Sequence, residues 1–205
     1  MRRIILAIIF CWPGYLYAQS LIKIPHSSPP IIDGVWHQNE WGSSDSVLIS
    51  IDQTNGGVKV FFQHDGRHLY LAYMGRLESA NALFPEVLID SDNDKSTDWK
   101  SDDWWFHVSA TDCEYNGAHS NYDSCELVRH NWKAMPNFTQ GAPMTDTVEI
   151  AIPFSTIGLD SNHKDTFGIS FEVTNTFNTW KFWPSDAVIG NPSTWANAVL
   201  LSKST

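Results

Sequence analysis

Apolar and polar residues alternate along much of the chain in short runs with a period of two. This period is typical of β-strands that bury one face, whereas an amphipathic helix repeats its apolar residues every three or four positions. Turn-forming residues separate the runs, and no long helical period is present. The clearest alternating runs are 47–51, 58–62, 69–73, 148–152 and 167–173.

The turn sequence His64-Asp65-Gly66-Arg67 lies between two of these runs and predicts a β-hairpin. Weaker patterns predict further strands at 86–90, 103–109, 126–129 and 198–201, and one helical turn at 155–159. About nine or ten short strands with very little helix are typical of an all-β, single-domain antiparallel β-sandwich.

The first residues have the features of a secretion signal. Two arginines precede a short apolar run from Ile4 to Cys11, and Leu16-Tyr17-Ala18 forms a cleavage site before Gln19. The apolar run is too short to span a bilayer. We therefore expect a signal peptide at 1–18, cleavage near Ala18, one folded domain at 19–205, and a secreted or periplasmic protein without membrane insertion.

The chain of 205 residues is acidic, with a formal net charge of −10, and the predicted leader contains no acidic residue. A surface of this sign does not favour nucleic acid or anionic membranes, which bind clustered lysine and arginine. Outside the leader only Cys113 and Cys125 remain. In an oxidising compartment such a pair predicts one disulfide.

Tryptophan is unusually abundant. A core of this size needs only a few indole rings, so several are expected at the surface, where they stack against flat, partly apolar ligands such as sugars. The alternative is that a small β-domain uses tryptophan to fill its core. The nine tryptophans outside the leader are Trp36, Trp41, Trp99, Trp104, Trp105, Trp132, Trp180, Trp183 and Trp195.

One acidic segment has oxygen ligands at alternate positions. Asp90, Asp92 and Asp94 suit a hard cation such as calcium, and the nearby Asp102 and Asp103 offer further ligands. The segment is not an EF-hand, because lysine replaces the required glycine. The alternative is a solvated acidic turn, since Asp and Asn favour turns in any case.

Catalytic signatures are absent from the sequence. There is no Gly-x-Ser-x-Gly motif, and the histidines are scattered without the spacing of a zinc site. Glu86, Glu149 and Glu172 offer carboxylates for glycoside hydrolysis, but Glu149 belongs to an alternating strand and is expected to face solvent. We therefore do not predict an enzyme.

Several motifs, in order, resemble family 9 carbohydrate-binding modules, within the wider DOMON-like superfamily. An apolar pair with Asp-Gly and a later Glu-Trp resembles the family's opening, and the other motifs resemble its hairpin, its Asp-ending strand, its most recognisable strand and its ending. The segments are 31–41, 58–71, 86–90, 148–154, 167–169 and 192–200. The resemblance implies a β-sandwich that binds sugar without catalysis.

The chain departs from this family at the sugar site. Members resemble one another in holding a sugar between two tryptophans, but Phe84 and Ile189 stand near those positions here. Glu86 matches the family's glutamate, whereas His107 replaces its arginine. The fold is therefore the safer inference, and a structural or adhesion domain that has lost its ligand stays open.

We interpret five residues as the carbohydrate-binding set: Glu86, Trp105, His107, Trp180 and Trp183. Trp180 and Trp183 are expected at the start of a long loop at 181–193, where they form the second wall of the site. The carboxylate accepts hydrogen bonds from sugar hydroxyls, and the indoles pack against pyranose C–H faces. The framework motifs place Trp36, Trp41 and Trp195 in the core.

The predicted function is therefore secreted, non-catalytic carbohydrate binding, with calcium as the candidate cofactor and a separate glycan-degrading enzyme as a candidate partner. A third alternative is a b-type haem domain, because some sandwiches of this superfamily resemble cytochromes with Met and His ligands. Met74, Met135 and Met144 are available for that role, but no spacing singles out a pair.

Overall fold

The computed structural model describes residues 20–52, 56–75, 83–108, 113–116, 131–137, 146–160, 166–175 and 180–203. The predicted leader and Cys125 lie outside these residues. The elements, in chain order, are β1 (Leu21–Ile24), α1 (Gln38–Trp41), β2 (Asp45–Asp52), β3 (Gly56–His64), β4 (His68–Gly75), β5 (Leu83–Asp90), β6 (Asp103–His107), β7 (Cys113–Asn116), β8 (Lys133–Asn137), β9 (Asp146–Pro153), β10 (Phe167–Asn175), β11 (Trp180–Trp183), the 3-10 helix η1 (Pro192–Thr194) and β12 (Ala196–Leu200).

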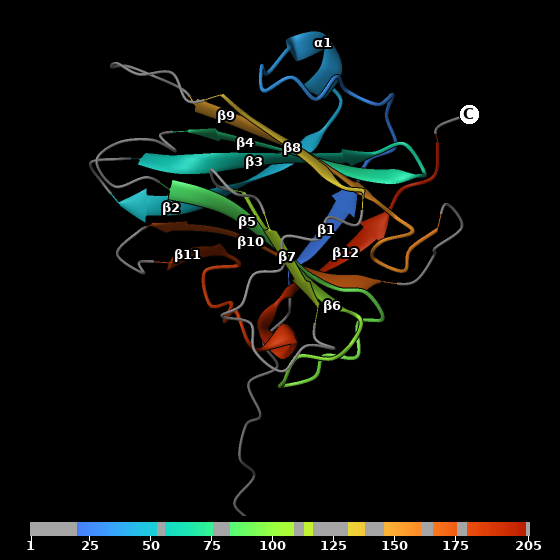
Figure 1. Ribbon diagram of the computed structural model, residues 1–205, viewed down its shortest axis with the longest axis vertical. Helices are drawn as coiled ribbons and strands as arrows, with labels where there is room; N and C mark the ends of the chain where they lie inside the picture. The colour runs from blue at the N-terminus through green and yellow to red at the C-terminus, as the bar shows by residue number, and fades with distance from the viewer. Residues whose placement is uncertain are drawn as a thin grey trace, which may run out of the picture.

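The described strands form two sheets packed face to face. The larger sheet has the order β1-β12-β10-β5-β6-β7, with β11 also paired to β10, and the smaller has the order β2-β3-β4-β9-β8. Only β1 and β12 are parallel among the described pairs. Figure 1 shows the two layers, with α1 above the smaller sheet. The predicted β-sandwich is therefore confirmed.

The central core lies between the sheets and consists of the apolar residues that the alternation predicted. Phe62 of β3, Leu71 of β4, Ile150 of β9 and Phe171 of β10 are buried in one cluster. Phe62 and Phe171 stack across the two sheets, with ring centroids 5.8 Å apart. Because successive side chains of a strand point to opposite faces, this inner core determines which residues stand on the two outer faces.

The N-terminal segment covers the outer face of the smaller sheet, so the expectation that Glu149 faces solvent is wrong. Its side chain is fully buried under Trp41, with which it forms a hydrogen bond. Trp41 is buried in this second cluster, and Trp36 packs on it while remaining partly exposed. Both tryptophans therefore pack outside the sandwich rather than in its central core.

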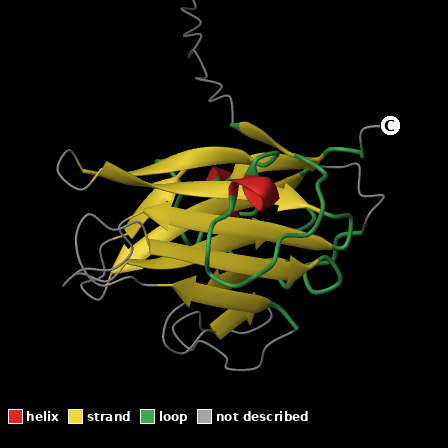
Figure 2. Ribbon diagram, turned by 90° about the horizontal axis from the view of Figure 1, so that it is seen from above, coloured by secondary structure: helices red, strands yellow, loops and turns green. Residues whose placement is uncertain are grey.

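Some elements differ from the sequence-based assignment. The weak patterns did not predict β1, β7, β8 or β11, whose four or five residues are too few for a clear period. The predicted helical turn at 155–159 is a series of turns. The strand predicted at 126–129 lies outside the described residues. Figure 2 shows the strands running side by side, with a loop and a helix lying across them in this view. No helix in the described ranges is both long and apolar enough to cross a bilayer.

Candidate functional site

The outer face of the larger sheet brings together the acidic and aromatic residues that the sequence singled out. Glu172 of β10 pairs with Glu86 of β5, and Glu86 pairs with His107 of β6. Residues directly opposite each other on neighbouring strands share a face. These three side chains therefore form a row across the sheet, on the side opposite Phe171 and the core.

Glu86 organises two ring systems. Its Oε2 accepts a hydrogen bond of 2.9 Å from Trp105 Nε1, and its Oε1 lies 2.5 Å from His107 Nδ1. The residue is only 2% exposed. The centroids of the Trp105 and His107 rings are 5.5 Å apart, and Phe84 lies at the same distance on the other side of His107. The buried carboxylate thus holds two of the three partly exposed rings in this strip, and Phe84 packs against the second of them.

Glu172 lies behind this strip and is fully buried. Neither of its carboxyl oxygens has a hydrogen-bond donor among the described residues. Burial, followed by the negative charge of Glu86, raises the pKa of Glu172 to about 11. Two buried carboxyl groups side by side cannot both ionise cheaply. Burial beside Glu86 therefore favours the uncharged form of the Glu172 carboxyl group.

The fourth strand of this face adds two more rings. In β11, Trp180 stands opposite Thr174, and Phe182 stands opposite Glu172. Trp180 is 47% exposed, whereas Phe182 is partly buried. Phe182 was not among the sequence candidates, although it alternates with Trp183 and therefore had to point to the opposite side.

Trp183 is the one predicted binding residue that lies apart from the other four. It belongs to β11 rather than to a loop, and it packs against the central core. The centroids of the Trp183 and Phe171 rings are 6.0 Å apart. The structure thus groups Glu86, Trp105, His107 and Trp180 on the outer face and places Trp183 on the inner face.

A third apolar cluster continues the outer face toward the end of β5. Trp195 is fully buried there with Leu88, and Trp105 and Ile189 pack against them. Trp195 is therefore buried as expected, but on the outside of the sheet. Ile189 and Phe84, which replace the expected tryptophans, both pack on this aromatic face.

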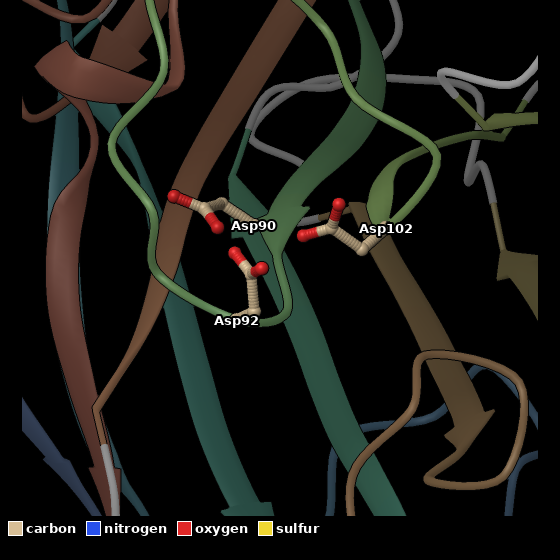
Figure 3. A group of neighbouring side chains, drawn as sticks. All are labelled: Asp90, Asp92 and Asp102. Carbon is tan, nitrogen blue, oxygen red and sulfur yellow. The ribbon is translucent and has the colours of Figure 1, made fainter.

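An acidic cluster lies where β5 ends and β6 begins. One carboxylate oxygen from each of Asp90, Asp92 and Asp102 lies within 4.8 Å of the others. Figure 3 shows the carboxyl groups of Asp90 and Asp92 next to each other, with the carboxyl group of Asp102 facing them. Asp90 is fully buried, and its Oδ1 has no hydrogen-bond partner among the described residues. Converging carboxylate oxygens, of which Asp90 Oδ1 and Asp102 Oδ2 have no donor among the described residues, fit a calcium ion, which prefers oxygen ligands.

The pKa values of the cluster reflect the same crowding. Burial raises the pKa of Asp90 to about 6 and that of the adjacent Asp103 to about 7, and neighbouring carboxylates contribute to both shifts. The pKa of Asp102 is raised by burial and by Asp92. A bound divalent cation would offset this accumulation of negative charge.

Asp94 is not in the cluster, in contrast to the alternating-ligand expectation. Asn93 and Lys95 on either side have left-handed backbone, each with φ 56°, and the chain turns there. Asp94 is exposed, and its Oδ1 accepts a hydrogen bond from the Ser96 amide. The third member of the cluster is Asp102, which the sequence offered only as a further ligand.

The loop that carries the acidic cluster also contacts the aromatic face. Lys95 Nζ donates a hydrogen bond of 3.0 Å to the carbonyl of Trp195, and its backbone amide donates to Asp90 Oδ2. Trp99 packs edge-on against Trp195, with centroids 5.4 Å apart. The position of Trp195, and through it of Trp105, is therefore tied to the acidic loop.

The predicted disulfide cannot be placed. Cys113 begins β7, but Cys125 lies outside the described residues. The candidate haem ligands Met74 and Met135 belong to the smaller sheet, and Met144 also lies outside the described residues.

No known family profile matches the sequence, and no curated protein matches it. Solved structures do. A family 9 carbohydrate-binding module from Caldicellulosiruptor kristjanssonii in complex with cellotriose is 18% identical, with a TM-score of 0.68 over 90% of this chain and 95% of that one. The module in complex with glucose is also 18% identical, with a TM-score of 0.66 over 90% and 97%.

A third similar structure comes from Bacteroides uniformis and is 9% identical, with a TM-score of 0.58 over 90% of this chain and all of that one. At these identities the similarity establishes the architecture. The chain has the β-sandwich fold of family 9 carbohydrate-binding modules.

Proposed function

We propose that this protein binds neutral carbohydrate, without catalysis, on the outer face of β10, β5, β6 and β11. The observation that carries the proposal is the pair of rings, Trp105 and His107, that the buried Glu86 holds in fixed positions. A preorganised ring loses little conformational freedom when a ligand packs on it, so it contributes efficiently to binding.

The composition of this face suits a sugar. A pyranose has an apolar C–H face that packs on an aromatic ring, and hydroxyl groups around its rim that need polar partners. Trp180 offers a largely exposed indole, and the partly exposed imidazole of His107 offers a polar atom beside the rings. Because Glu86 is buried, its main contribution is to orient Trp105 and His107 rather than to contact the ligand.

Charge supports a neutral ligand over an anionic one. The chain has a formal net charge of −10, and the carboxylate of Glu86 lies directly behind the rings. Like charges brought together at an interface cost binding energy. Two of the solved structures of similar fold are complexes with cellotriose and glucose, which are both neutral.

We also propose that Asp90, Asp92 and Asp102 bind calcium. The buried, partnerless Oδ1 of Asp90 supports this assignment, because a bound cation would satisfy it. The ion would hold the acidic loop, and with it Lys95 and the Trp195 cluster, against the sheet.

Secretion and the Cys113–Cys125 bridge complete the proposal. Both follow from sequence features, namely the leader-like residues 1–18 and an even pair of cysteines. Intact-mass measurement of the exported protein tests them together. A chain that starts near Gln19 and lacks two hydrogens relative to the dithiol supports both, and a full-length chain with free thiols contradicts both.

A glycan array tests the binding function, with the full protein expressed and exported in its natural form. Bound glycans are then titrated by calorimetry against Trp105→Ala and Trp180→Ala, and against Trp36→Ala on the smaller sheet as the matched control. We expect the first two variants to lose about tenfold in affinity and the control to retain it.

Two results would count against this function. Binding of no glycan, with or without calcium, would favour a structural or adhesion role for the sandwich. Equal losses in all three variants would show that the outer face of the larger sheet is not the site.

A further inference from the structure

Glu172 is a fully buried acid without an ordinary partner. It stands opposite Glu86, which is itself 2% exposed, on the adjacent strand. A buried carboxylate without a hydrogen-bond donor or a counter-ion is strongly unfavourable. No ion pair to Glu172 is present among the described residues, so a negative charge on it would have no counter-ion there.

The groups around the pair are already engaged. The titratable neighbours are Glu86 from β5, His107 from β6 and Tyr73 from β4, whereas β11 places the apolar Phe182 opposite Glu172. Tyr73 donates its hydroxyl to the carbonyl oxygen of Glu86 at 2.5 Å. His107 and the indole of Trp105 both contact the Glu86 carboxylate. Each of these contacts is to Glu86, and no described residue donates a hydrogen bond to Glu172.

A hydrogen bond between the two carboxyl groups therefore needs a proton on Glu172 itself. We propose that Glu172 is a protonated carboxylic acid that donates a hydrogen bond to the Glu86 carboxylate, and so acts as a positioning residue for Trp105 and His107. The proposal rests on the proposed carbohydrate site, which it deepens. It assigns the pair one negative charge shared over two buried carboxyl groups.

This arrangement has a consequence for the ligand-binding face. With the Glu172 hydroxyl, the Glu86 carboxylate has contacts from three residues, and charge-assisted hydrogen bonds of this kind are short and strong. A fully satisfied buried network holds its members in one geometry. Loss of the proton would place two anions side by side and would release the contacts that orient the two rings.

The proton can be observed without any sugar. In protein labelled with ¹³C at the glutamate side-chain carboxyl, NMR titration from about pH 3 to pH 9 follows each carboxyl carbon. We expect one carbon to keep the chemical shift of a protonated acid throughout and to be absent from the spectrum of Glu172→Gln. A complete set of carboxyls that titrate near their ordinary values would overturn the proposal.

Binding of the array-identified glycan tests the positioning role. Glu172→Gln keeps the shape and offers an N–H donor to Glu86, so we expect its affinity to stay within about twofold of the wild type. Glu172→Leu removes the donor, and Glu86→Gln removes the charged acceptor. We expect each of these two variants to lose roughly tenfold, the usual cost of a hydrogen bond to a charged group.

The two experiments separate the possible failures. If no variant and no wild type binds a glycan, the proposed function fails, while the NMR titration still decides whether Glu172 holds the proton. If Glu172→Gln loses as much affinity as Glu172→Leu while remaining folded by NMR, Glu172 needs its acid group for another reason and the positioning role is refuted.

Discussion

Trp41 donates a hydrogen bond of 2.8 Å from its indole Nε1 to Oε1 of Glu149, a residue 108 positions later in the chain. The other oxygen of this carboxylate accepts the backbone amides of Asp33 and Gly34, at 3.0 and 2.9 Å. Glu149 therefore joins the N-terminal covering segment to the middle of the smaller sheet. Residues of the opening motif thus bond directly to a residue of the 148–154 motif.

Replacing Glu149 with alanine should destabilise the fold by about 3 kcal/mol, because three buried or partly buried donors lose their acceptor. The measurement is chemical denaturation followed by circular dichroism. Lys133→Ala is the control, since this residue is exposed on the neighbouring strand β8 and should change stability by less than about 0.5 kcal/mol. Equal stability of the two variants would contradict the anchoring role of Glu149.

The inner faces could be predicted from the sequence, and the covering of the outer faces could not. The alternation of Val60 with Phe62, and of Leu69 with Leu71, correctly identified the residues between the sheets. Periodicity assigns residues to a face but does not reveal whether a distant segment covers that face. Glu149 was therefore expected in solvent, although residues 31–41 bury it.

The candidate site shows the same division. Glu86 and His107 could be grouped because the family resemblance matched both to ligand-facing positions, and the alternation put Trp105 on the same face as His107. Trp183 was misplaced because β11 has only four residues and was taken as loop, so no alternation was applied to it. Asp94 was preferred to Asp102 as a metal ligand because spacing along a loop does not describe how the loop folds back.

Calcium should stabilise the protein through Asp92 and not through Asp94. At a free calcium concentration a hundredfold above the dissociation constant, ligand linkage gives about 2.7 kcal/mol of additional stability. Thermal melts with calcium and with chelator are compared for the wild type, Asp92→Asn and Asp94→Asn. We expect the calcium-dependent rise in Tm to persist in Asp94→Asn and to disappear in Asp92→Asn. Identical melts of the wild type in both buffers would exclude a calcium site that matters for stability.

The protonation of Glu172 predicts how stability depends on pH. The folded-state pKa of about 11 lies far above the ordinary value of 4.5, and burial is the main cause. The folded state therefore keeps a proton that the unfolded state releases. The resulting stability is fully present below about pH 4.5 and is lost steadily as the pH rises toward 11, by about 1.4 kcal/mol per pH unit.

Glu172→Gln isolates this effect, because the other titrating groups are common to both proteins. Denaturation at several values between about pH 6 and pH 9 should show the wild type losing stability relative to the variant with that slope. Parallel pH profiles for the two proteins would mean that Glu172 has an ordinary pKa in the folded state.

Gly168 has no side chain, and the side chain of Asp90 occupies the space where its Cβ atom would lie. The two residues are paired on β10 and β5, and a Cβ atom at Gly168 would lie 2.8 Å from Asp90 Cβ and 3.0 Å from its Oδ2. Because the paired backbones cannot separate without breaking the ladder, the aspartate side chain must move. Gly168→Ala should therefore lower the free energy of unfolding by about 1–3 kcal/mol, the usual penalty of overpacking, and should weaken the calcium-dependent rise in Tm.

Gly190→Ala is the matched control, since the nearest atom to its added methyl group, Trp99 Nε1, is 3.8 Å away. A calcium response that is equal in both alanine variants would show that the position of Asp90 does not control the metal site.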